Sequence, residues 1–296
     1  MYQMMSLPLY SGTLGEYNSW RDLGQELERL GYDGIEGVWG GEDLPKDLPA
    51  ELILGYHLIF YPDWLDFYRD DRAALKQKFG SLEVTASFYG GLGPDTLLEQ
   101  YRADLRRAVN LGARYVVFHV SDVSLEEGYT YRWLHTNQEV IDAAVEVVNL
   151  ILGEERWPFE FLVENQWWPG FTFTEPEETA RLLEGIRFAG KGILLDTGHL
   201  MNACTELKTE AEGADYIRRM LNRHGSLAKW VRGVHLHQSL SGAYVKAHTG
   251  SLPAGLPEDY MERFGVSYQH ILQIDQHRPW TDPAILSVLE LSLIHI

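Results

Sequence analysis

The stretch GILLDTGH (192–199) indicates the fold, because it joins a short apolar run to polar residues that can carry chemistry. The run is continuously apolar rather than alternating, as in a parallel strand buried on both faces. Asp196 and His199 follow it, and Gly198 between them gives the backbone freedom to turn both side chains towards one point. We therefore expect a buried parallel strand with two candidate ligands at its carboxyl end.

Similar apolar runs recur along the chain and alternate with amphipathic stretches of helical period. The predicted strands are residues 7–11, 34–39, 52–60, 115–120, 159–164, 192–196 and 231–237. Repeated strand–helix units imply right-handed crossovers and a parallel sheet. In 296 residues, seven or eight units favour a closed (β/α)8 TIM barrel, and no Gly-x-Gly-x-x-Gly turn supports a doubly wound sheet. No Pro-, Gly- or Ser-rich linker is present, so we expect one domain over residues 1–296.

Capping residues indicate where helices begin. Ser19 is placed to cap a helix that Gly31 ends. In a capping box, a Thr side chain and a Glu three residues later satisfy each other's free backbone N–H groups. The pattern occurs at Thr136 with Glu139, Thr174 with Glu177 and Thr209 with Glu212.

Candidate ligands stand at or just past the ends of most predicted strands: His57, His119, Glu164, Asp196, His199, His235 and His237. The carboxyl ends of barrel strands converge on one mouth, where catalytic groups are placed. Imidazole and carboxylate together suit a divalent ion such as zinc, manganese, cobalt or magnesium. His235 and His237 share strand parity, so both side chains are expected on one face.

Structural roles are the alternative for each of these residues. A single His at a strand end is commonly a hydrogen-bonded core residue, and Asp196 could cap the helix that follows it. The tryptophan-rich stretch 167–171 is either a lid or plain packing. The joint pattern decides for a metal site, because chance core histidines would not all select the same strand end.

Composition and charge narrow the function classes. The chain has 25 Lys and Arg against 43 Asp and Glu, and a net charge of −18 argues against loose binding to nucleic acid or anionic membrane. It has no run of about 18 apolar residues, so we expect no membrane span. Cys204 is its only cysteine, and the first ten residues lack a signal-peptide pattern, so we expect a cytoplasmic protein.

These motifs resemble the xylose isomerase-like TIM barrels, which include sugar isomerases and epimerases and the endonuclease IV group. The resemblance rests on LVEN (162–165), DTGH (196–199), GVHLH (233–237) and IDQH (274–277), with the histidines of GYH and FHV. The three-metal endonuclease IV pattern implies these eight ligands and a last-strand Glu: Glu164, His57, His119, Asp196, His199, His235, Asp275 and His277. The isomerase and epimerase pattern holds one metal with Glu, Asp, His and a last-strand Glu, and Glu164, Asp196 and His235 match the first three.

The chain departs from the resemblance near its C-terminus. After a short helix at 282–290, the family would continue into an eighth strand with a second essential Glu, and residues 291–296 supply none. Two interpretations compete. The chain is truncated or altered here, which we favour, or residues 271–277 serve as the eighth strand. Truncation would leave an open barrel edge and an incomplete metal shell.

The resemblance implies a metal-dependent isomerase or epimerase acting on a sugar, a sugar phosphate or an inositol. Glu164 would be both ligand and base, and His199, His237 or Trp167 would orient hydroxyls. Segments 61–71 and 239–270 would shape the pocket. The alternatives are an endonuclease IV-like phosphodiester hydrolase, which the ligand order favours and the charge opposes, and a catalytically silent metal- or sugar-binding barrel. Related barrels often pair, so a homo-oligomer is an expectation too.

Overall fold

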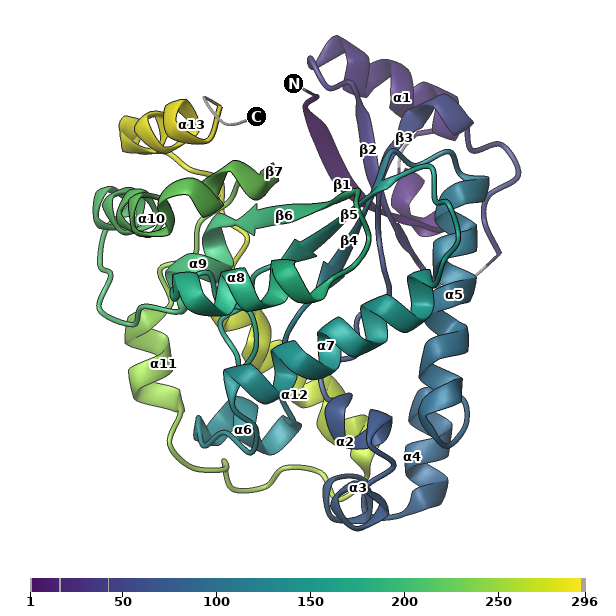
Figure 1. Cartoon of the computed structure of the whole chain (residues 1–296), viewed down its shortest axis with the longest axis vertical. Coiled ribbons are helices and arrows are strands. Elements are labelled where there is room, and N and C mark those ends of the chain that lie inside the picture. Colours follow the sequence, from purple (N-terminus) through teal and green to yellow (C-terminus); the bar gives the residue numbers. More distant parts are fainter. Residues whose placement is uncertain (1, 16, 42, 294–296) are drawn as a thin grey trace.

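The computed structural model describes residues 2–15, 17–41 and 43–293, and its centre is one parallel sheet (Figure 1). Seven strands pair in chain order: β1 (Met4–Leu9), β2 (Gly34–Trp39), β3 (Ile53–His57), β4 (Tyr115–His119), β5 (Glu160–Glu164), β6 (Lys191–Asp196) and β7 (Val231–His235). The predicted α/β fold with parallel strands is confirmed. The predicted bounds differ most at β1, which begins at Met4, and at β3, which ends at His57.

Helices cover the outside of the sheet and connect its strands (Figure 1). The α-helices are α1 (Trp20–Arg29), α2 (Leu65–Tyr68), α3 (Arg72–Phe79), α4 (Leu82–Tyr89), α5 (Pro94–Asn110), α6 (Leu125–Thr130), α7 (Asn137–Leu152), α8 (Pro176–Gly185), α9 (Thr197–Asn202), α10 (Glu210–His224), α11 (Gly242–His248), α12 (Tyr260–Ile274) and α13 (Leu286–Leu293). Short 3-10 helices are η1 (Ser11–Leu14), η2 (Ala50–Leu52), η3 (Gly225–Trp230) and η4 (Pro283–Ile285). Within the described residues, none of the helices combines the length and apolarity needed to cross a membrane.

The sheet curls into an incomplete barrel. β2 and β7 are not neighbours in the strand order, yet His235 Nε2 in β7 lies 3.0 Å from Glu36 Oε1 in β2. The eight-stranded barrel is confirmed only in part, because residues 2–15, 17–41 and 43–293 form seven strands and no eighth. Residues 294–296, part of the segment in which the last carboxylate was sought, lie outside the described residues.

Residues 271–277 are not a strand, so that interpretation of the sequence was wrong. Residues up to Ile274 belong to α12, which Asp259 caps by accepting from the Glu262 N–H. The helix buries Tyr260, Ser267, His270 and Ile274 along one side, which is a helical spacing rather than a strand alternation. The short helix predicted at 282–290 is present as η4 and α13.

Most predicted caps are present. Ser19 caps α1, and Thr136 with Glu139 forms the expected capping box at α7. Thr209 accepts from the Glu212 N–H at the start of α10. The Glu212 carboxylate accepts from the Lys208 N–H rather than from the Thr209 N–H, so only half of the predicted box is present.

The capping box predicted at Thr174 was wrong. Glu175 is the residue before α8, and its side chain makes no capping hydrogen bond. Thr174 instead pairs its hydroxyl with that of Thr172, at 2.7 Å. Pro176 begins the helix, where its fixed φ suits the first turn and its missing N–H removes a donor that a cap would satisfy.

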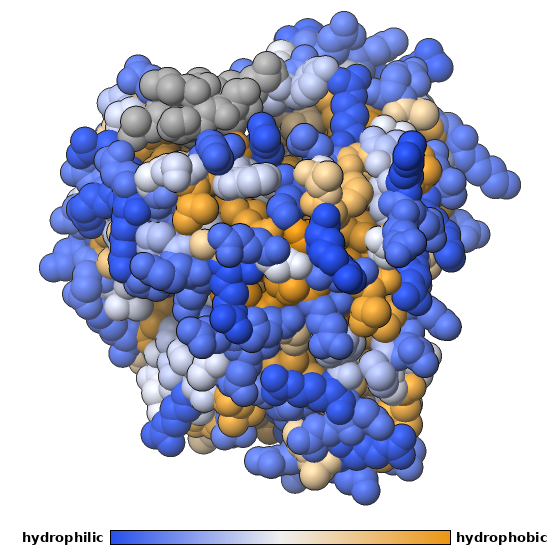
Figure 2. All heavy atoms as spheres, viewed as in Figure 1, coloured by the Kyte–Doolittle hydropathy of each residue, from blue (hydrophilic) through white to orange (hydrophobic). Residues whose placement is uncertain are grey.

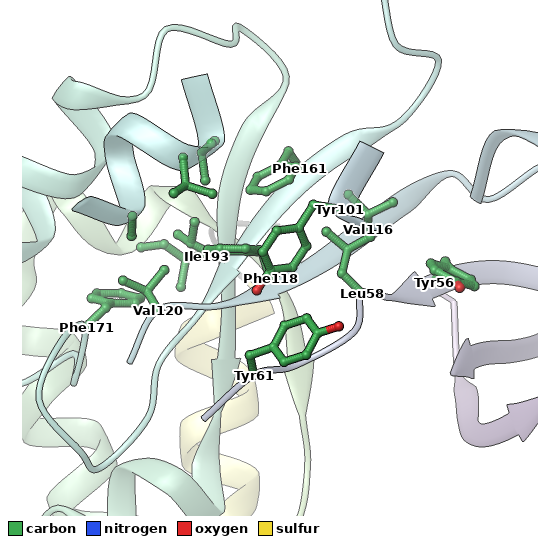
Figure 3. Packing of buried hydrophobic residues seen from close by; sticks show 14 of the residues in the cluster. Tyr56, Leu58, Tyr61, Tyr101, Val116, Phe118, Val120, Phe161, Phe171 and Ile193 are labelled. Atoms are coloured by element: carbon green, nitrogen blue, oxygen red, sulfur yellow. The ribbon is translucent and has the colours of Figure 1, made fainter. Parts of the chain in front are cut away.

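Outward-facing strand residues pack under the helices and form the main core. Phe118 of β4 contacts Tyr101 of α5 and Phe161 of β5, with ring centroids 5.3 and 5.7 Å apart (Figure 3). Hydrophilic side chains dominate the outer surface in Figure 2, with apolar residues showing between them. This core holds the strands in place from outside the barrel.

Inward-facing residues of the same strands form a small separate cluster inside the barrel, made of Val117, Leu162 and Leu194. Because strand side chains alternate, the residues two positions further on point inward as well. They are His119, Glu164 and Asp196. The inner apolar cluster therefore lies directly beneath the polar residues at the mouth of the barrel.

Leu162→Ala should destabilise the protein by about 2–5 kcal/mol, since it opens a cavity in this inner cluster. Leu162 is 2% exposed. The free energy of unfolding from urea titration measures the loss. Leu150→Ala on the exposed side of α7 is the control and should cost well under about 1 kcal/mol. If Leu162→Ala and Leu150→Ala lowered the free energy of unfolding equally, the inner cluster would not be a tightly packed part of the protein.

Candidate metal centre

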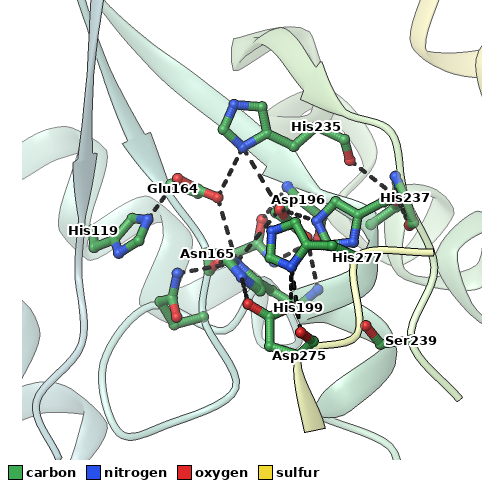
Figure 4. Close-up of polar contacts among 12 residues, drawn as sticks. His119, Glu164, Asn165, Asp196, His199, His235, His237, Ser239, Asp275 and His277 are labelled. Carbon is green, nitrogen blue, oxygen red and sulfur yellow. Dashed lines mark hydrogen bonds and ion pairs between the residues drawn. The ribbon is translucent and has the colours of Figure 1, made fainter. Parts of the chain in front are cut away.

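The structure brings all nine residues singled out from the sequence to the carboxyl ends of the strands, and Figure 4 labels each of them except His57. They are His57, His119, Glu164, Asp196, His199, His235, His237, Asp275 and His277. Their donor atoms fall into three groups, in each of which the atoms lie within 4.8 Å of one another. Glu164 belongs to two of the groups, and it is 1% exposed.

The first group joins β3, β4 and β5. His57 Nε2 and His119 Nε2 lie 2.9 Å apart, and both face Glu164 Oε2, at 3.3 and 2.9 Å. His57 is fixed from its other side, where Nδ1 lies 2.9 Å from the Leu58 carbonyl oxygen. Two imidazole nitrogens and one carboxylate oxygen therefore converge on one point.

The second group joins β5, β6 and β7. His235 Nδ1 lies 3.1 Å from Glu164 Oε1 and 3.6 Å from Asp196 Oδ2. Asn165 fixes Asp196 from the neighbouring strand end, since its side chain accepts from the Asp196 N–H and donates to the Asp196 carbonyl. Glu164 thus offers one oxygen to the first group and the other to the second.

The sequence left open whether Asp196 caps a helix or belongs to the ligand cluster, and in the structure it does both. Its Oδ1 accepts from the His199 N–H at 2.7 Å and caps α9. Its Oδ2 faces the imidazoles of His235 and His237, the latter at 2.7 Å. One carboxylate therefore starts a helix and contributes to the cluster, because its two oxygens are used separately.

The third group gathers residues from more distant segments. His199 Nε2 lies 3.4 Å from Asp275 Oδ2, and His277 Nδ1 lies 3.1 Å from Asp275 Oδ1. The rings of His237 and His277 stack with centroids 4.0 Å apart. Paired backbone hydrogen bonds between residues 238 and 278 hold the segment after α12 against the segment after β7.

Glu36 is a buried carboxylate of the site that sequence reasoning missed. It is 3% exposed, it faces His235 Nε2 at 3.0 Å, and it accepts from the Tyr115 hydroxyl at 2.7 Å. It lies on the side of the His235 ring opposite Glu164 and Asp196. The available signal was a single charged residue inside the apolar run GIEGVW (34–39), where an unpaired charge would be costly.

The charges of the cluster balance one another. Burial alone would raise the pKa of Glu164, but His119 and His235 beside it lower that pKa well below its ordinary range. Burial alone would lower the pKa of His199 and His235, but the carboxylates that face them raise it well above the usual value. Burial dominates at His119 and lowers its pKa to about 4. His119 is therefore neutral, as a ligand must be.

The donor set fits a divalent ion. Zinc bonds of about 2.0–2.2 Å to nitrogen and oxygen separate tetrahedral ligand atoms by roughly 3.3–3.6 Å. The facing atoms of the first group lie 2.9 to 3.3 Å apart, and those of His235 with Glu164 and Asp196 lie 3.1 and 3.6 Å apart. His119 Nδ1 and His237 Nδ1 are buried without a hydrogen-bond partner among the described residues.

A cavity of about 290 Å³ adjoins the cluster. His119, His199 and Asp275 form one side of it, and residues of α6 and α12 form the other. Trp167 and Trp168 are both buried and line it, so the tryptophan-rich stretch is a wall of this cavity. The predicted contribution of segment 239–270 comes from α12, whereas segment 61–71 contributes Pro62 alone.

The sequence matches a family model described as xylose isomerase-like TIM barrel over residues 25–284. No curated protein matches it significantly. Among solved structures, 3-keto-D-glucoside 4-epimerase from E. coli aligns over 99% of this chain and 98% of its own, at 11% identity and a TM-score of 0.49. Endonuclease IV from Thermus thermophilus aligns over 100% of both chains, at 16% identity and a TM-score of 0.43. D-psicose 3-epimerase aligns over 99% of both chains, at 11% identity and a TM-score of 0.44. At these values, the three likenesses carry no argument about activity.

Glu164→Gln should destabilise the metal-free protein, and more at pH 5.5 than at pH 8.5. The pKa values of His57, His199 and His235 are raised in the folded state. These histidines contribute fully to stability below their pKa in the unfolded chain, which is about 6.5. The contribution is lost as pH rises through their pKa values in the folded protein. Glu164 itself stays ionised over this range.

The expected loss is about 3 kcal/mol at pH 5.5, measured by urea unfolding in EDTA. Glu178→Gln, which alters a half-buried carboxylate paired with Asn137 in another part of the barrel, is the control. A loss that is the same at both pH values would contradict the idea that Glu164 is balanced by protonated imidazoles.

Proposed function

Since the chain belongs to the xylose isomerase-like TIM barrel family, we propose that it is a divalent-metal-dependent isomerase or epimerase for a small carbohydrate. The observation that carries the proposal is the joint use of Glu164 and Asp196. Glu164 turns its two oxygens to different imidazoles, those of His235 and His119, whereas Asp196 caps α9 with one oxygen and faces the His235 and His237 imidazoles with the other. A cavity large enough for a small molecule is lined by His119, His199, Asp275 and His277 of the same cluster.

In this proposal, Glu164, Asp196 and His235 hold the ion on which the reaction depends. A bound divalent ion acts as a Lewis acid that polarises a carbonyl and stabilises the negative charge that develops beside it. Glu164 is also the base in this proposal, because its carboxylate is ionised and holds no proton of its own. His199 and His237, whose ring centroids are 5.9 Å apart, orient substrate hydroxyls.

A phosphodiester hydrolase of the endonuclease IV kind is the second candidate. The three donor groups favour it, because they contain all eight residues that match the three-metal pattern, together with His237. The charge opposes it, since affinity for nucleic acid rests on phosphate neutralisation by Lys and Arg, and acidic residues outnumber them 43 to 25. Three zinc ions per chain together with nicking of abasic-site DNA would favour the hydrolase over the isomerase.

The isomerase proposal predicts metal-dependent proton exchange. When the zinc-, manganese- or cobalt-loaded protein is incubated in D2O with a panel of sugars, inositols and carbohydrates that carry an apolar group, NMR should show deuterium entering a C–H next to a carbonyl. EDTA should abolish the exchange, and Glu164→Gln should slow it at least about a hundredfold. Glu178→Gln should leave it unchanged. Full exchange by Glu164→Gln would show that another group is the base, and no exchange with any member of the panel would contradict the isomerase or epimerase proposal.

Glu36→Gln should weaken metal binding about tenfold or more. Glu36 accepts from His235 Nε2, so that when a metal ion replaces the proton on Nδ1, the lone pair of Nδ1 faces Glu164 and Asp196. Titration with Co(II), followed by its visible absorption, measures the affinity without any substrate.

Asp104→Asn is the matched control for that titration. Asp104 is a buried carboxylate that accepts from the Tyr56 hydroxyl at 2.6 Å, as Glu36 accepts from Tyr115, but it contacts no histidine of the cluster. Its substitution should leave cobalt affinity within about twofold of the wild-type value. Wild-type affinity in Glu36→Gln would contradict a positioning role for Glu36.

A further inference from the structure

The cavity beside the candidate metal centre has a mainly apolar wall. Its lining includes Phe60, Val123, Trp167, Trp168, Phe264 and Ile271. The apolar surface begins directly at the cluster: Phe60 packs against the His119 ring with centroids 4.4 Å apart, and Trp167 against the His199 ring at 5.1 Å. A ligand held by the cluster would therefore meet aromatic surface as soon as it extends away from it.

This wall is a separate structural unit rather than an extension of the barrel core. Val123, Trp167, Trp168 and Ile274 form a hydrophobic cluster of their own with Val245. Figure 1 shows α12 lying beside α6 at the end of the barrel to which the strand arrows point. These buried apolar side chains lie over the mouth. They belong neither to the main core under the helices nor to the small cluster inside the barrel.

Few polar groups of the wall are free to bind a ligand. Trp167 Nε1, Trp168 Nε1 and Ser267 Oγ belong to residues that line the cavity, and all three atoms are buried without a hydrogen-bond partner among the described residues. The ring nitrogens of His270 are already occupied, by the Tyr244 hydroxyl at 3.0 Å and the Gly128 carbonyl oxygen at 3.2 Å. Away from the cluster, the wall could satisfy one or two polar groups of a ligand.

Two physical effects then select the ligand. A hydroxyl buried without a partner costs about 1–3 kcal/mol, and a fully hydroxylated sugar would bury several against this wall. An apolar group gains about 25 cal/mol for each Å² that it removes from water here. An apolar group is therefore the better occupant of the cavity.

On the basis of the proposed function, we infer that the substrate is oxygen-rich at one end and apolar at the other. The oxygen-rich end carries the carbonyl and lies at the donor cluster. The other end is an aromatic ring, an apolar ring or a short aliphatic group, and it packs between the tryptophans and α12. Trp168 and Ser267 receive one polar substituent of that apolar end. A carbohydrate joined to an apolar group has this form, and a free sugar does not.

Three hydroxamates with the same metal-binding head test this inference. Acetohydroxamate, benzohydroxamate and gluconohydroxamate differ only in carrying a methyl group, a phenyl ring or a hydroxylated chain. Their affinities are measured by calorimetry with the zinc-loaded and the EDTA-treated protein. Benzohydroxamate should bind at least about tenfold more tightly than acetohydroxamate, and gluconohydroxamate no more tightly than acetohydroxamate.

Variants of α12 assign the preference to the cavity. Leu272 lines the cavity and is 40% exposed, so Leu272→Asn should fold and should reduce the preference for benzohydroxamate severalfold. Ile271→Asn, deeper in the wall, should reduce it further. Val266→Asn changes an exposed residue of the same helix that does not line the cavity, and it should leave the preference unchanged.

Different results would contradict the proposed metal centre and the proposed apolar end of the substrate. Affinities that do not depend on zinc would contradict the metal centre, while the ranking of the three probes would still decide the nature of the cavity. Equal affinities, tightest binding of gluconohydroxamate, or no binding of any probe to either form would overturn the apolar end of the substrate.

Discussion

The mouth of this barrel depends on two carboxylates that are buried without a lysine or arginine beside them. Glu164 and Asp196 are each 1% exposed, and the ion pairs that they form within the described residues are all with histidines. Burying a carboxylate is costly unless charge and hydrogen bonds compensate it. Imidazoles compensate only while protonated, and a divalent ion can replace those protons. The same constraint that holds the cluster together therefore prepares it to bind metal.

The fold and most of this cluster could be predicted from the sequence, because both follow from local patterns. The run GILL with its neighbour DTGH gives a buried strand and two residues at its end, and strand parity then places Asp196 above Leu194 inside the barrel. Asp275 and His277 were found differently. They lie after a helix rather than a strand, and the resemblance to a family identified them where periodicity could not.

What the sequence did not reveal depends on contacts between distant segments. Glu36 faces His235 only because the sheet curls and brings β2 across to β7. Residues 271–277 looked like a strand because IDQH ends an apolar run, but the residues before it bury one helical side against α6 and α11. Likewise, the tryptophan-rich stretch could be interpreted either as a lid or as packing until α12 was seen to close the cavity on its other side.

Zinc-edge anomalous diffraction from crystals of the zinc-loaded protein shows whether a metal ion replaces the protons of this cluster. We expect an anomalous peak within bonding distance of Glu164, Asp196 and His235, and further peaks only at the groups around His119 and His277. Zinc bound solely at surface residues, with Glu164 still paired to the imidazoles alone, would contradict the proposed metal centre.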